Sequence, residues 1–336
     1  MMLVSILIPA YKAESFITET IRSACAQTWP HKEVIIVDDG SPDRTFEVAR
    51  ALESATVKVV RQENGGAPAA RNKAFELAQG EYIQWLDADD LLHPDKIRLQ
   101  LQGAESGLTS RTLLTSSWGK FFFNTERTEF VPDQLWQDLS PVDWVLTKFR
   151  YNVWMNPAVW LVSRCLTEAA GPWDSRLARS GDDDGEYICR LLTHATATRF
   201  VAEAQAYYRI GNVGGLSWGM GTNNVTLHSL VLSLAATVQH LLRMEDSPRT
   251  REASGKYLAA FAHHFYGSDG KCFAELAQFA REIGCELAAP RTSWKYRPLD
   301  LIAGPRLTRK FMLNWRTAKL LLRRRLERRL AVGSGA

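Results

Sequence analysis

The residues with the clearest chemical potential are acidic side chains that occur side by side. Carboxylates are adjacent or nearly so in Asp38-Asp39, in Asp87-Ala88-Asp89-Asp90 and in Asp182-Asp183-Asp184. Neighbouring carboxylates repel one another unless a cation is present, and hard ions such as Mg²⁺ and Mn²⁺ prefer oxygen ligands. The motif from Asp87 to Asp90 therefore predicts a divalent cation that also binds the phosphates of a substrate.

Each acidic motif also has a structural explanation, which the sequence leaves open. Asp89 or Asp90, just before Leu91-Leu92-His93-Pro94, would cap a following helix and stabilise it by about 1 kcal/mol. The stretch Asp38-Asp39-Gly40-Ser41 has the composition of a turn between a strand and a helix. The three aspartates from Asp182 to Asp184 would be favoured by a helix dipole, although capping requires only one of them.

The elements that must position these groups alternate between apolar runs and helical patterns. The apolar runs predict strands at Val4 to Ile8, Val34 to Val37, Val57 to Val60 and Tyr82 to Leu86. Strands that alternate with helices predict a parallel sheet with helices on both faces, and such sheets bind ligands beyond the carboxyl ends of their strands. The residues that follow these four strands should meet there: Pro9-Ala10-Tyr11, Asp38-Asp39, Asn64-Gly65-Gly66 and Asp87 to Asp90.

The residue types suggest a role for each motif. A carboxylate of Asp38 or Asp39 could accept a hydrogen bond from a nucleobase imide or a ribose hydroxyl. The guanidinium of Arg71 could pair with phosphate or with the acidic strand ends. One aspartate between Asp182 and Asp184 could act as a general base, which is worth about 10²- to 10⁴-fold in rate. No Gly-x-Gly-x-x-Gly follows the first strand, so a dinucleotide cofactor is not expected.

After about residue 110 the alternation loosens and the chain changes character. Short strands are expected at Leu113 to Thr115, Lys120 to Phe123, Val159 to Val162, Thr198 to Val201 and Gln205 to Arg209. The stretch from Gly211 to Gly221 has five glycines and predicts a flexible loop. Helix formers dominate beyond it, in segments near 225–244, 250–266, 270–284 and 306–330.

Taken together, these motifs resemble the family 2 glycosyltransferases with the GT-A fold. The resemblance is carried by Val4-Ser-Ile-Leu-Ile-Pro-Ala-Tyr11, Val37-Asp-Asp-Gly-Ser41, Asn64-Gly-Gly66, Ala70-Arg-Asn72, Gly80-Glu-Tyr-Ile83, Leu86-Asp-Ala-Asp-Asp90 and, more faintly, Ala170-Gly-Pro-Trp-Asp174 and Asp184-Gly-Glu-Tyr-Ile-Cys-Arg190. It implies an α/β, Rossmann-like fold with a mostly parallel sheet flanked by helices and a helical C-terminal extension. The expected catalytic domain is 1–220, with a nucleotide-sugar half (1–110) and an acceptor half (111–220), followed by a helical region, 221–336.

The resemblance also implies an activity and its residues. Members of the family commonly transfer a sugar with inversion, using Mn²⁺ or Mg²⁺, from a nucleotide-sugar donor to a glycan or lipid-linked hydroxyl. By position in the motifs, Asp184 matches the catalytic base and Asp183 is the fallback. Asp89 matches the metal ligand, and Asp87 would contact the ribose or the metal. The donor-binding residues are then Pro9, Ala10, Tyr11, Asp38, Asp39, Arg71 and Asp87, and Asp39 would suit the uracil of a UDP-sugar.

Two other functions are compatible with such a fold. A sugar nucleotidyltransferase usually has a glycine-rich first loop followed by a basic residue, and Pro9-Ala10-Tyr11 does not supply it. A catalytically inactive relative could serve as an interaction module at a membrane surface. The retention of Asp39, Asp87, Asp89 and Asp184 argues against that loss of activity.

The C-terminal region carries most of the positive charge. From Arg291 onward there are 13 Lys or Arg residues against two acidic ones, although the net charge of the whole chain is +4. Apolar residues recur there every three or four positions, at Leu307, Phe311, Trp315, Ala318, Leu322, Leu326 and Leu330. This pattern predicts a basic amphipathic helix that binds an anionic membrane surface or, alternatively, docks on the acidic catalytic domain. Nucleic acid is not expected as a partner, because no stacking aromatics alternate with the basic residues.

Composition limits the remaining possibilities. The 336 residues are 46% hydrophobic and 23% charged, which indicates a folded protein. Five widely spaced cysteines predict reduced thiols, and neither a transmembrane helix nor a signal peptide is expected, which favours a cytoplasmic protein. If the basic helix binds membrane, the protein would be peripheral on the inner face of that membrane. Among the tryptophans, Trp154 and Trp218 are the candidates for an acceptor groove.

Overall fold

The computed structural model describes residues 2–103, 109–178, 182–212, 223–268 and 270–333 of the 336-residue chain. The described strands form one nine-stranded sheet in the order β3-β2-β1-β4-β8-β6-β9-β5, with β7 paired to β6. Its first strands are β1 (Val4–Ala10), β2 (Lys32–Asp38), β3 (Val57–Arg61) and β4 (Tyr82–Trp85). These four strands pair in parallel, as the sequence predicts.

Helices cover both faces of this parallel part of the sheet. Ile6, Leu7 and Ile8 are consecutive residues of β1 and all are fully buried, although alternate side chains of a strand point to opposite faces. The helices that follow the strands in this half and the next are α1 (Ile17–Cys25), α2 (Thr45–Arg50), α3 (Ala67–Leu77), α4 (Lys96–Gly103), α5 (Pro141–Tyr151), α6 (Arg164–Ala170) and α7 (Asp183–Leu192). Burial on both faces explains why the strands have unbroken apolar sequences.

The second half of the sheet is mixed in direction. It contains β5 (Leu91–Leu92), β6 (Thr112–Phe121), β7 (Glu129–Phe130), β8 (Leu161–Ser163) and β9 (Ala197–Arg209). Strand β8 runs antiparallel to β4 and β6, whereas β6 and β9 are parallel. The short strands expected at Leu113 to Thr115 and Lys120 to Phe123 belong to one long strand, β6, and those expected at Thr198 to Val201 and Gln205 to Arg209 belong to another, β9. The pairing of β6 with β9 shifts register between Ser116 and Ser117.

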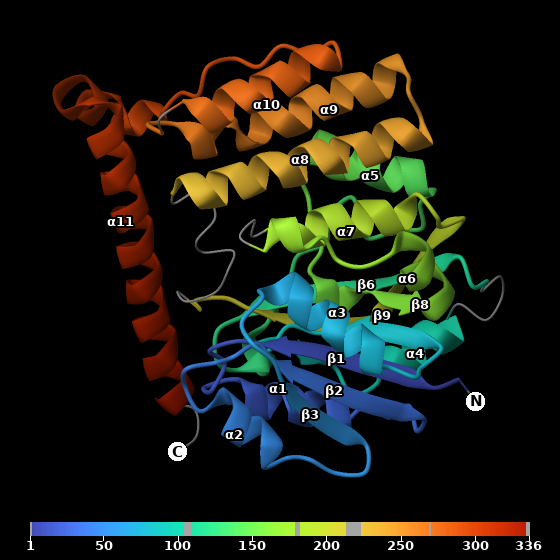
Figure 1. Ribbon diagram of the computed structural model, residues 1–336. Helices are drawn as coiled ribbons and strands as arrows, with labels where there is room; N and C mark the ends of the chain where they lie inside the picture. Colours follow the sequence, from blue (N-terminus) through green and yellow to red (C-terminus); the bar gives the residue numbers. More distant parts are fainter. Residues whose placement is uncertain (1, 104–108, 179–181, 213–222, 269, 334–336) are drawn as a thin grey trace.

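The C-terminal part is a layer of helices packed on α7. It consists of α8 (Asn224–Met244), α9 (Pro248–Phe261) and α10 (Lys271–Glu282), and Figure 1 shows α8 lying along α7 with α9 and α10 above it. Helix α8 is long and apolar enough to span a membrane by length and composition, but 56% of its most apolar window is buried inside the protein. Its contacts are therefore those of a core helix.

Helix α11 (Arg297–Gly333) is separate from this layer and runs down one side of the molecule toward the sheet (Figure 1). It contains the helix predicted near 306–330, and a kink divides it at Gly304, whose φ of 76° is left-handed and which precedes Pro305. All five cysteines are free thiols, as the composition indicates.

Candidate functional site

Arg71 of α3 joins two acidic motifs that are far apart in the sequence. Its Nη1 donates a hydrogen bond to Asp183 Oδ2 (2.6 Å), and its Nη2 donates to Asp87 Oδ1 (2.9 Å). The guanidinium is 5% exposed and lies 4.2 Å from the ring centre of Trp173. The end of β4 and the start of α7 therefore meet around one buried cation, and the contact with Asp87 is the pairing with an acidic strand end that the sequence suggests for Arg71.

The three adjacent aspartates at the start of α7 have three different environments. Asp182 faces the helical layer, where its Oδ2 accepts hydrogen bonds from Ser233 Oγ (3.2 Å) and the Tyr257 hydroxyl (3.4 Å). Asp183 is the partner of Arg71. Within the described part of the chain, the partly exposed carboxylate of Asp184 accepts a single hydrogen bond, from the backbone N–H of Gly185 (2.9 Å).

Gly185 is needed for this arrangement. The carboxylate of Asp182 folds back over the start of α7 and occupies the space in which a Cβ at position 185 would lie. A larger residue there would displace Asp182 from Ser233 and Tyr257. Gly185 thus makes room for Asp182, and the three adjacent aspartates include both a structural carboxylate and a less constrained one.

The less constrained carboxylate also has a shifted acidity. Burial, followed by the negative charges of Asp182 and Asp183, raises the pKa of Asp184 to about 8, while Arg71 and Lys148 act in the opposite direction. A raised pKa makes the ionised carboxylate a stronger base, and the second oxygen of Asp184 accepts no hydrogen bond from a described residue.

The acidic turn after β4 does not cap a helix. Residues Leu91–Leu92 form β5, and α4 begins at Lys96, so the capping explanation for Asp89 and Asp90 is wrong. Asp89 Oδ2 instead accepts from Asn212 Nδ2 (2.9 Å), and Asp90 Oδ1 accepts from the backbone N–H of Arg209 (2.8 Å). Burial is the main cause that raises the pKa of both Asp89 and Asp90.

The oxygens left over in this turn suit a hard divalent cation. Asp87 and Asp89 each use one carboxylate oxygen on a described protein donor, and each keeps a second oxygen. The Oδ2 atom of Asp90 is buried without a hydrogen-bond partner among the described residues. Besides burial, the charge of Asp87 raises the pKa of Asp89, and the charges of Asp89 and Asp87 raise that of Asp90. Neighbouring carboxylates with oxygens to spare form a donor set that fits Mg²⁺ or Mn²⁺.

The Asp38-Asp39 turn is organised differently. Asp39 is 2% exposed and accepts four hydrogen bonds, from Gln62 Nε2 (2.7 Å), Asn64 Nδ2 (3.0 Å) and the backbone N–H groups of Gly65 (2.9 Å) and Gly66 (2.8 Å). A carboxylate has about four acceptor positions, so these donors fill it. Asp39 therefore holds the loop between β3 and α3, and its contact with a nucleobase stays a prediction.

The other residues of this turn and of the neighbouring strand end are close to Asp39. Asp38 accepts from the backbone N–H of Ser41 (3.2 Å) and pairs with Arg61 Nε (3.2 Å). The backbone oxygen of Ala10, which follows Pro9 in β1, accepts from the N–H of Asp39 (2.8 Å). Tyr11 is 47% exposed at this edge. Pro9, Ala10, Tyr11, Asp38 and Asp39 thus share one end of the sheet with the acidic turn after β4.

One of the two predicted acceptor residues can be located. Trp154 is 38% exposed and packs against Trp118 (ring centres 4.8 Å apart) and Tyr208 (5.3 Å), so it belongs to an aromatic cluster at the protein surface. Trp218 lies outside the described residues, as does most of the predicted glycine-rich loop. The role of both tryptophans stays a prediction.

Arg209 is a site residue that the sequence analysis missed. Its side chain is 4% exposed, its Nε donates to the backbone oxygen of Asp89 (2.7 Å), and its Nη2 donates to Glu19 Oε2 (2.6 Å). Together with the hydrogen bond from its backbone N–H to Asp90, these contacts fix the acidic turn that follows β4. A cationic residue at the end of the strand predicted over Gln205 to Arg209 was the available signal, because a buried guanidinium requires acceptors.

The helical layer contributes a second missed residue, His240. His240 of α8 lies 2.9 Å from Glu186 Oε1 through its Nε2, and Glu186 also accepts from Arg190 Nε (2.8 Å). Trp173 stacks on Tyr187 with ring centres 3.9 Å apart, and the guanidinium of Arg71 lies 4.2 Å from the ring centre of Trp173. Helix α7 is therefore fixed partly by His240, from a helix that carries no recognisable motif, and partly by Trp173, from the Ala170 to Asp174 segment that the family resemblance includes.

The match to known proteins is strongest where these strand ends occur. Residues 5–125 match the family described as Glycosyl transferase family 2. These residues form a family 2 glycosyltransferase domain. The matched range contains Pro9, Asp39, Arg71, Asp87 and Asp89, whereas Asp183 and Asp184 lie beyond it.

Relatives of the family 2 domain are glycosyltransferases and polysaccharide synthases by name. TuaG of Bacillus subtilis, named as a glycosyltransferase of teichuronic acid biosynthesis, is 44% identical over 103 residues, which are 30% of this chain and 41% of TuaG. Chondroitin synthase of Pasteurella multocida is 43% identical over 102 residues, which are 30% of this chain and 11% of the synthase. The chain thus spans less than half the length of these relatives.

A solved structure extends the likeness of fold beyond the family 2 domain. Residues 1–349 of TarS from S. aureus superpose with a TM-score of 0.63 at 16% identity, over 84% of this chain and 82% of that TarS fragment. The same fragment has also been solved with UDP-GlcNAc, and that structure has a TM-score of 0.60 at 17% identity, covering 84% of this chain and 80% of the fragment. The expected GT-A fold with a helical C-terminal region is confirmed.

Proposed function

We propose that the chain transfers a sugar from a nucleotide-sugar donor to a hydroxyl group during polysaccharide or glycoconjugate synthesis. The observation that carries this proposal is the meeting of Asp87, Arg71 and Asp183, with the less constrained Asp184 beside them. The names of the relatives and the complex of TarS with UDP-GlcNAc support the same reaction class.

The proposed donor is a UDP-sugar bound across the carboxyl ends of β1, β2 and β4. The half-exposed ring of Tyr11 offers the base and ribose a surface, bordered by Pro9 and Ala10. Asp38 fixes the turn at Ser41, and Asp39 fixes the loop at Gly65 and Gly66. In this proposal the uracil imide takes the place of one of the four donors that now fill Asp39.

Asp87 and Asp89 would hold Mn²⁺ or Mg²⁺ through their remaining oxygens. When bound, the ion neutralises the diphosphate and stabilises the charge that develops on the leaving group. Arg71 contributes a positive charge at the same place, fixed by Asp183 and by the face of Trp173. Because these partners orient the guanidinium in advance, it needs little reorganisation when the leaving group departs.

Asp184 is the proposed base and Asp183 is the alternative. The acceptor hydroxyl loses its proton to Asp184, its oxygen bonds to the anomeric carbon, and the carbon–oxygen bond to the diphosphate breaks with its electron pair on the leaving group. Attack opposite to the leaving group inverts the anomeric carbon. Asp183 is committed to Arg71 and Asp182 to the helical layer, which favours Asp184.

A screen of nucleotide sugars tests this proposal. Mn²⁺-dependent binding and slow hydrolysis of the donor should be measured for the parent protein, for Asp89→Asn and for a matched control, Asp138→Asn, which changes an aspartate in an exposed ion pair with Arg199. The parent and the control should bind one donor class, and Asp89→Asn should lose the dependence on metal. If no nucleotide sugar binds with or without metal, the proposed activity is wrong.

The exposed face of α11 supports a second part of the proposal, binding to a membrane surface. Five large apolar residues at intervals of four or seven positions, which place them on one helical face, are between 47% and 60% exposed: Leu307, Phe311, Trp315, Leu322 and Leu326. The opposite face docks on the protein. Thr308 is fully buried, and Arg309 Nη2 donates to the backbone oxygen of His264 (3.1 Å).

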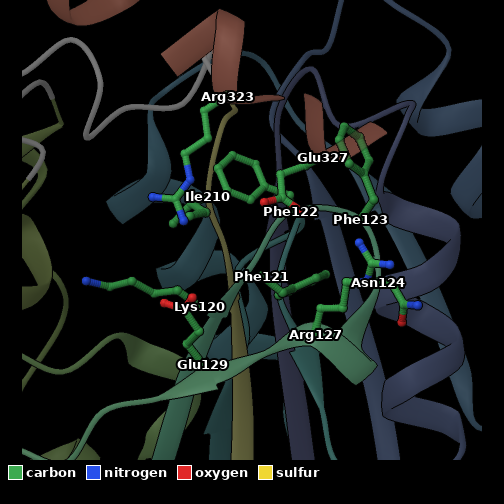
Figure 2. Close-up of a pocket in the computed structure, with 10 residues that line it drawn as sticks. All are labelled: Lys120, Phe121, Phe122, Phe123, Asn124, Arg127, Glu129, Ile210, Arg323 and Glu327. Carbon is green, nitrogen blue, oxygen red and sulfur yellow. The ribbon is translucent and has the colours of Figure 1, made fainter. Parts of the chain in front are cut away.

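The far end of α11 docks on β6 and the residues that follow it. The guanidinium of Arg323 lies 5.2 Å from the ring centre of Phe122, and that of Arg324 lies 5.7 Å from Phe123. Figure 2 shows Arg323 and Glu327 of α11 beside Phe122, around a small cavity of about 80 Å³. The helix is therefore docked through polar and basic residues, while its apolar stripe faces outward.

We infer that this stripe inserts into an anionic membrane surface and places the enzyme peripherally on its inner face, near a lipid-linked acceptor. Apolar side chains flanked by Lys and Arg are typical of helices that lie in the membrane interface. Full-length protein should sediment with phosphatidylglycerol vesicles, and the double variant Phe311→Ser/Trp315→Ser should not. The control Arg324→Gln, on the docked face, should still bind. Equal sedimentation of both variants and the parent would contradict the proposal.

A further inference from the structure

A second group of metal-ligating side chains lies in the helical layer, apart from the acidic site. His228 of α8 and Cys272 and Glu275 of α10 place a ring nitrogen, a sulfur and a carboxylate oxygen within 4.8 Å of one another. Cys272 and Glu275 are three residues apart and so lie on the same face of α10. That face meets the first turn of α8, since Cys272 Sγ is 4.0 Å from the backbone oxygen of Asn224.

The distances within this group suit a tetrahedral ion. His228 Nδ1 and Glu275 Oε2 are 3.3 Å apart, beyond the usual length of an N–H···O hydrogen bond. Two ligands bound to a tetrahedral Zn²⁺ at about 2.0–2.1 Å would be roughly 3.3 Å apart. The observed pair therefore has the separation of two zinc ligands, and Cys272 supplies the third.

The donor types select the metal. A thiolate, an imidazole and a carboxylate form a set that Zn²⁺ accepts, whereas Mg²⁺ and Mn²⁺ prefer oxygen alone. Cys272 is 5% exposed and occupies the second position of α10, where the helix dipole favours a thiolate. The side chains of His228 and Glu275 are 57% and 53% exposed, so an ion would be closed off on the protein side and open to a fourth ligand from solvent.

We propose that His228, Cys272 and Glu275 form a zinc site that fastens the N-terminal end of α8 to α10. As a bare surface pair, His228 and Glu275 would contribute about 0–1 kcal/mol, which makes them a weak link without metal. Helix α8 also carries Ser233 and His240, the partners of Asp182 and Glu186. The zinc site would stabilise the layer that holds α7, and it takes no part in sugar transfer.

Cobalt spectroscopy tests this site independently of enzyme activity. Co²⁺ should be added to the full-length, metal-stripped protein in the Asp89→Asn background, which removes a proposed ligand of the acidic site. The parent should show a thiolate-to-cobalt charge-transfer band in the near ultraviolet, saturating at one ion per chain. Cys272→Ser should lose the band, and the control Cys285→Ser, which changes a partly buried thiol elsewhere in the layer, should keep it.

A second variant keeps the test decisive if Cys272→Ser does not fold. His228→Gln retains the thiol and should bind Zn²⁺ at least tenfold more weakly in competition with a chromophoric chelator. One equivalent of Zn²⁺ should raise the melting temperature of the parent but not of His228→Gln. A parent without the band, a band that survives Cys272→Ser, or unchanged zinc affinity in His228→Gln would each overturn the proposal.

Discussion

The Asp38-Asp39 turn and the Asp182 to Asp184 segment are both clusters of adjacent carboxylates, yet the protein uses them in different ways. Asp39 is filled by four donors from the loop between β3 and α3. Asp184 accepts one described hydrogen bond, from Gly185, and is partly exposed. The number of adjacent acids therefore does not distinguish a structural carboxylate from a reactive one, whereas the donors that surround each oxygen do.

The difference has a local cause. The backbone at Gly65 and Gly66, where φ of Gly66 is +87°, directs two N–H groups toward Asp39. At the start of α7, the nearby donors are taken by Asp182 and Asp183 instead, through Ser233, Tyr257 and Arg71. Asp184 is left beside two other negative charges, and this repulsion adds to burial in raising its pKa.

The largest expected effect is on catalysis, at Asp184. Asp184→Asn should lower the transfer rate about 10²- to 10⁴-fold, because an amide cannot take the proton of the acceptor hydroxyl. Donor affinity should stay close to that of the parent, as measured by calorimetry with UDP. Asp138→Asn serves as the surface control. A transfer rate near that of the parent would assign the base to Asp183 and contradict the difference in role between Asp39 and Asp184.

The next effect is on stability, at Asp39. Asp39→Ala leaves four donors without their acceptor and should lower the free energy of unfolding by about 3 kcal/mol, measured in urea without nucleotide. The control Glu63→Ala changes an exposed acid in the same loop and should be neutral. If Asp39→Ala has the stability of the parent but no longer binds UDP, the main partner of Asp39 is the nucleotide.

A smaller effect is expected at Arg209. This residue acts indirectly, because it holds the backbone of the acidic turn after β4. Arg209→Lys should weaken the hydrogen bond to the backbone oxygen of Asp89 and lower the affinity for Mn²⁺ about tenfold, measured by paramagnetic resonance of free Mn²⁺. Arg199→Lys, in the same strand but in an exposed ion pair, is the matched control. Equal Mn²⁺ affinity in both variants would show that Arg209 does not position the turn.

The smallest expected effect is on the pH dependence of stability, again at Asp184. Because the pKa of Asp184 in the folded protein is about 8 and that of a free aspartate is 3.8, its stabilising contribution is complete below pH 3.8 and is lost as pH rises toward 8. Asp184→Asn should therefore gain stability relative to the parent between pH 5 and pH 9. Urea midpoints at several pH values measure this difference. A difference that does not change with pH would mean that Asp184 is ionised throughout.

The sequence predicts the first half of the fold well for a physical reason. Strands β1 to β4 are buried on both faces, so their apolar runs are unbroken and their polar ends are easy to find. The polar strand ends include Asp87, and the chemistry of a guanidinium predicts the pairing of Arg71 with these acidic ends. In the second half, the two expected pairs of strands became β6 and β9, because a register shift interrupts the pattern without ending the strands.

The sequence could not predict which of the adjacent aspartates are structural and which one is left to react. Asp39 is filled by donors 23 to 27 residues away, and Asp182 by Ser233 and Tyr257, which are 51 and 75 residues away. These donors carry no motif, and the family match ends at residue 125. Which carboxylate is free depends on packing between the sheet and the helical layer, which local patterns do not encode.

The central claim is most directly tested by a crystal structure of the chain with UDP and Mn²⁺. The account predicts the diphosphate beside Arg71, the ion on Asp87 and Asp89, and the free oxygen of Asp184 facing the same place. Nucleotide bound at another surface, or at this edge with Asp184 engaged by a protein donor and turned away, would contradict it.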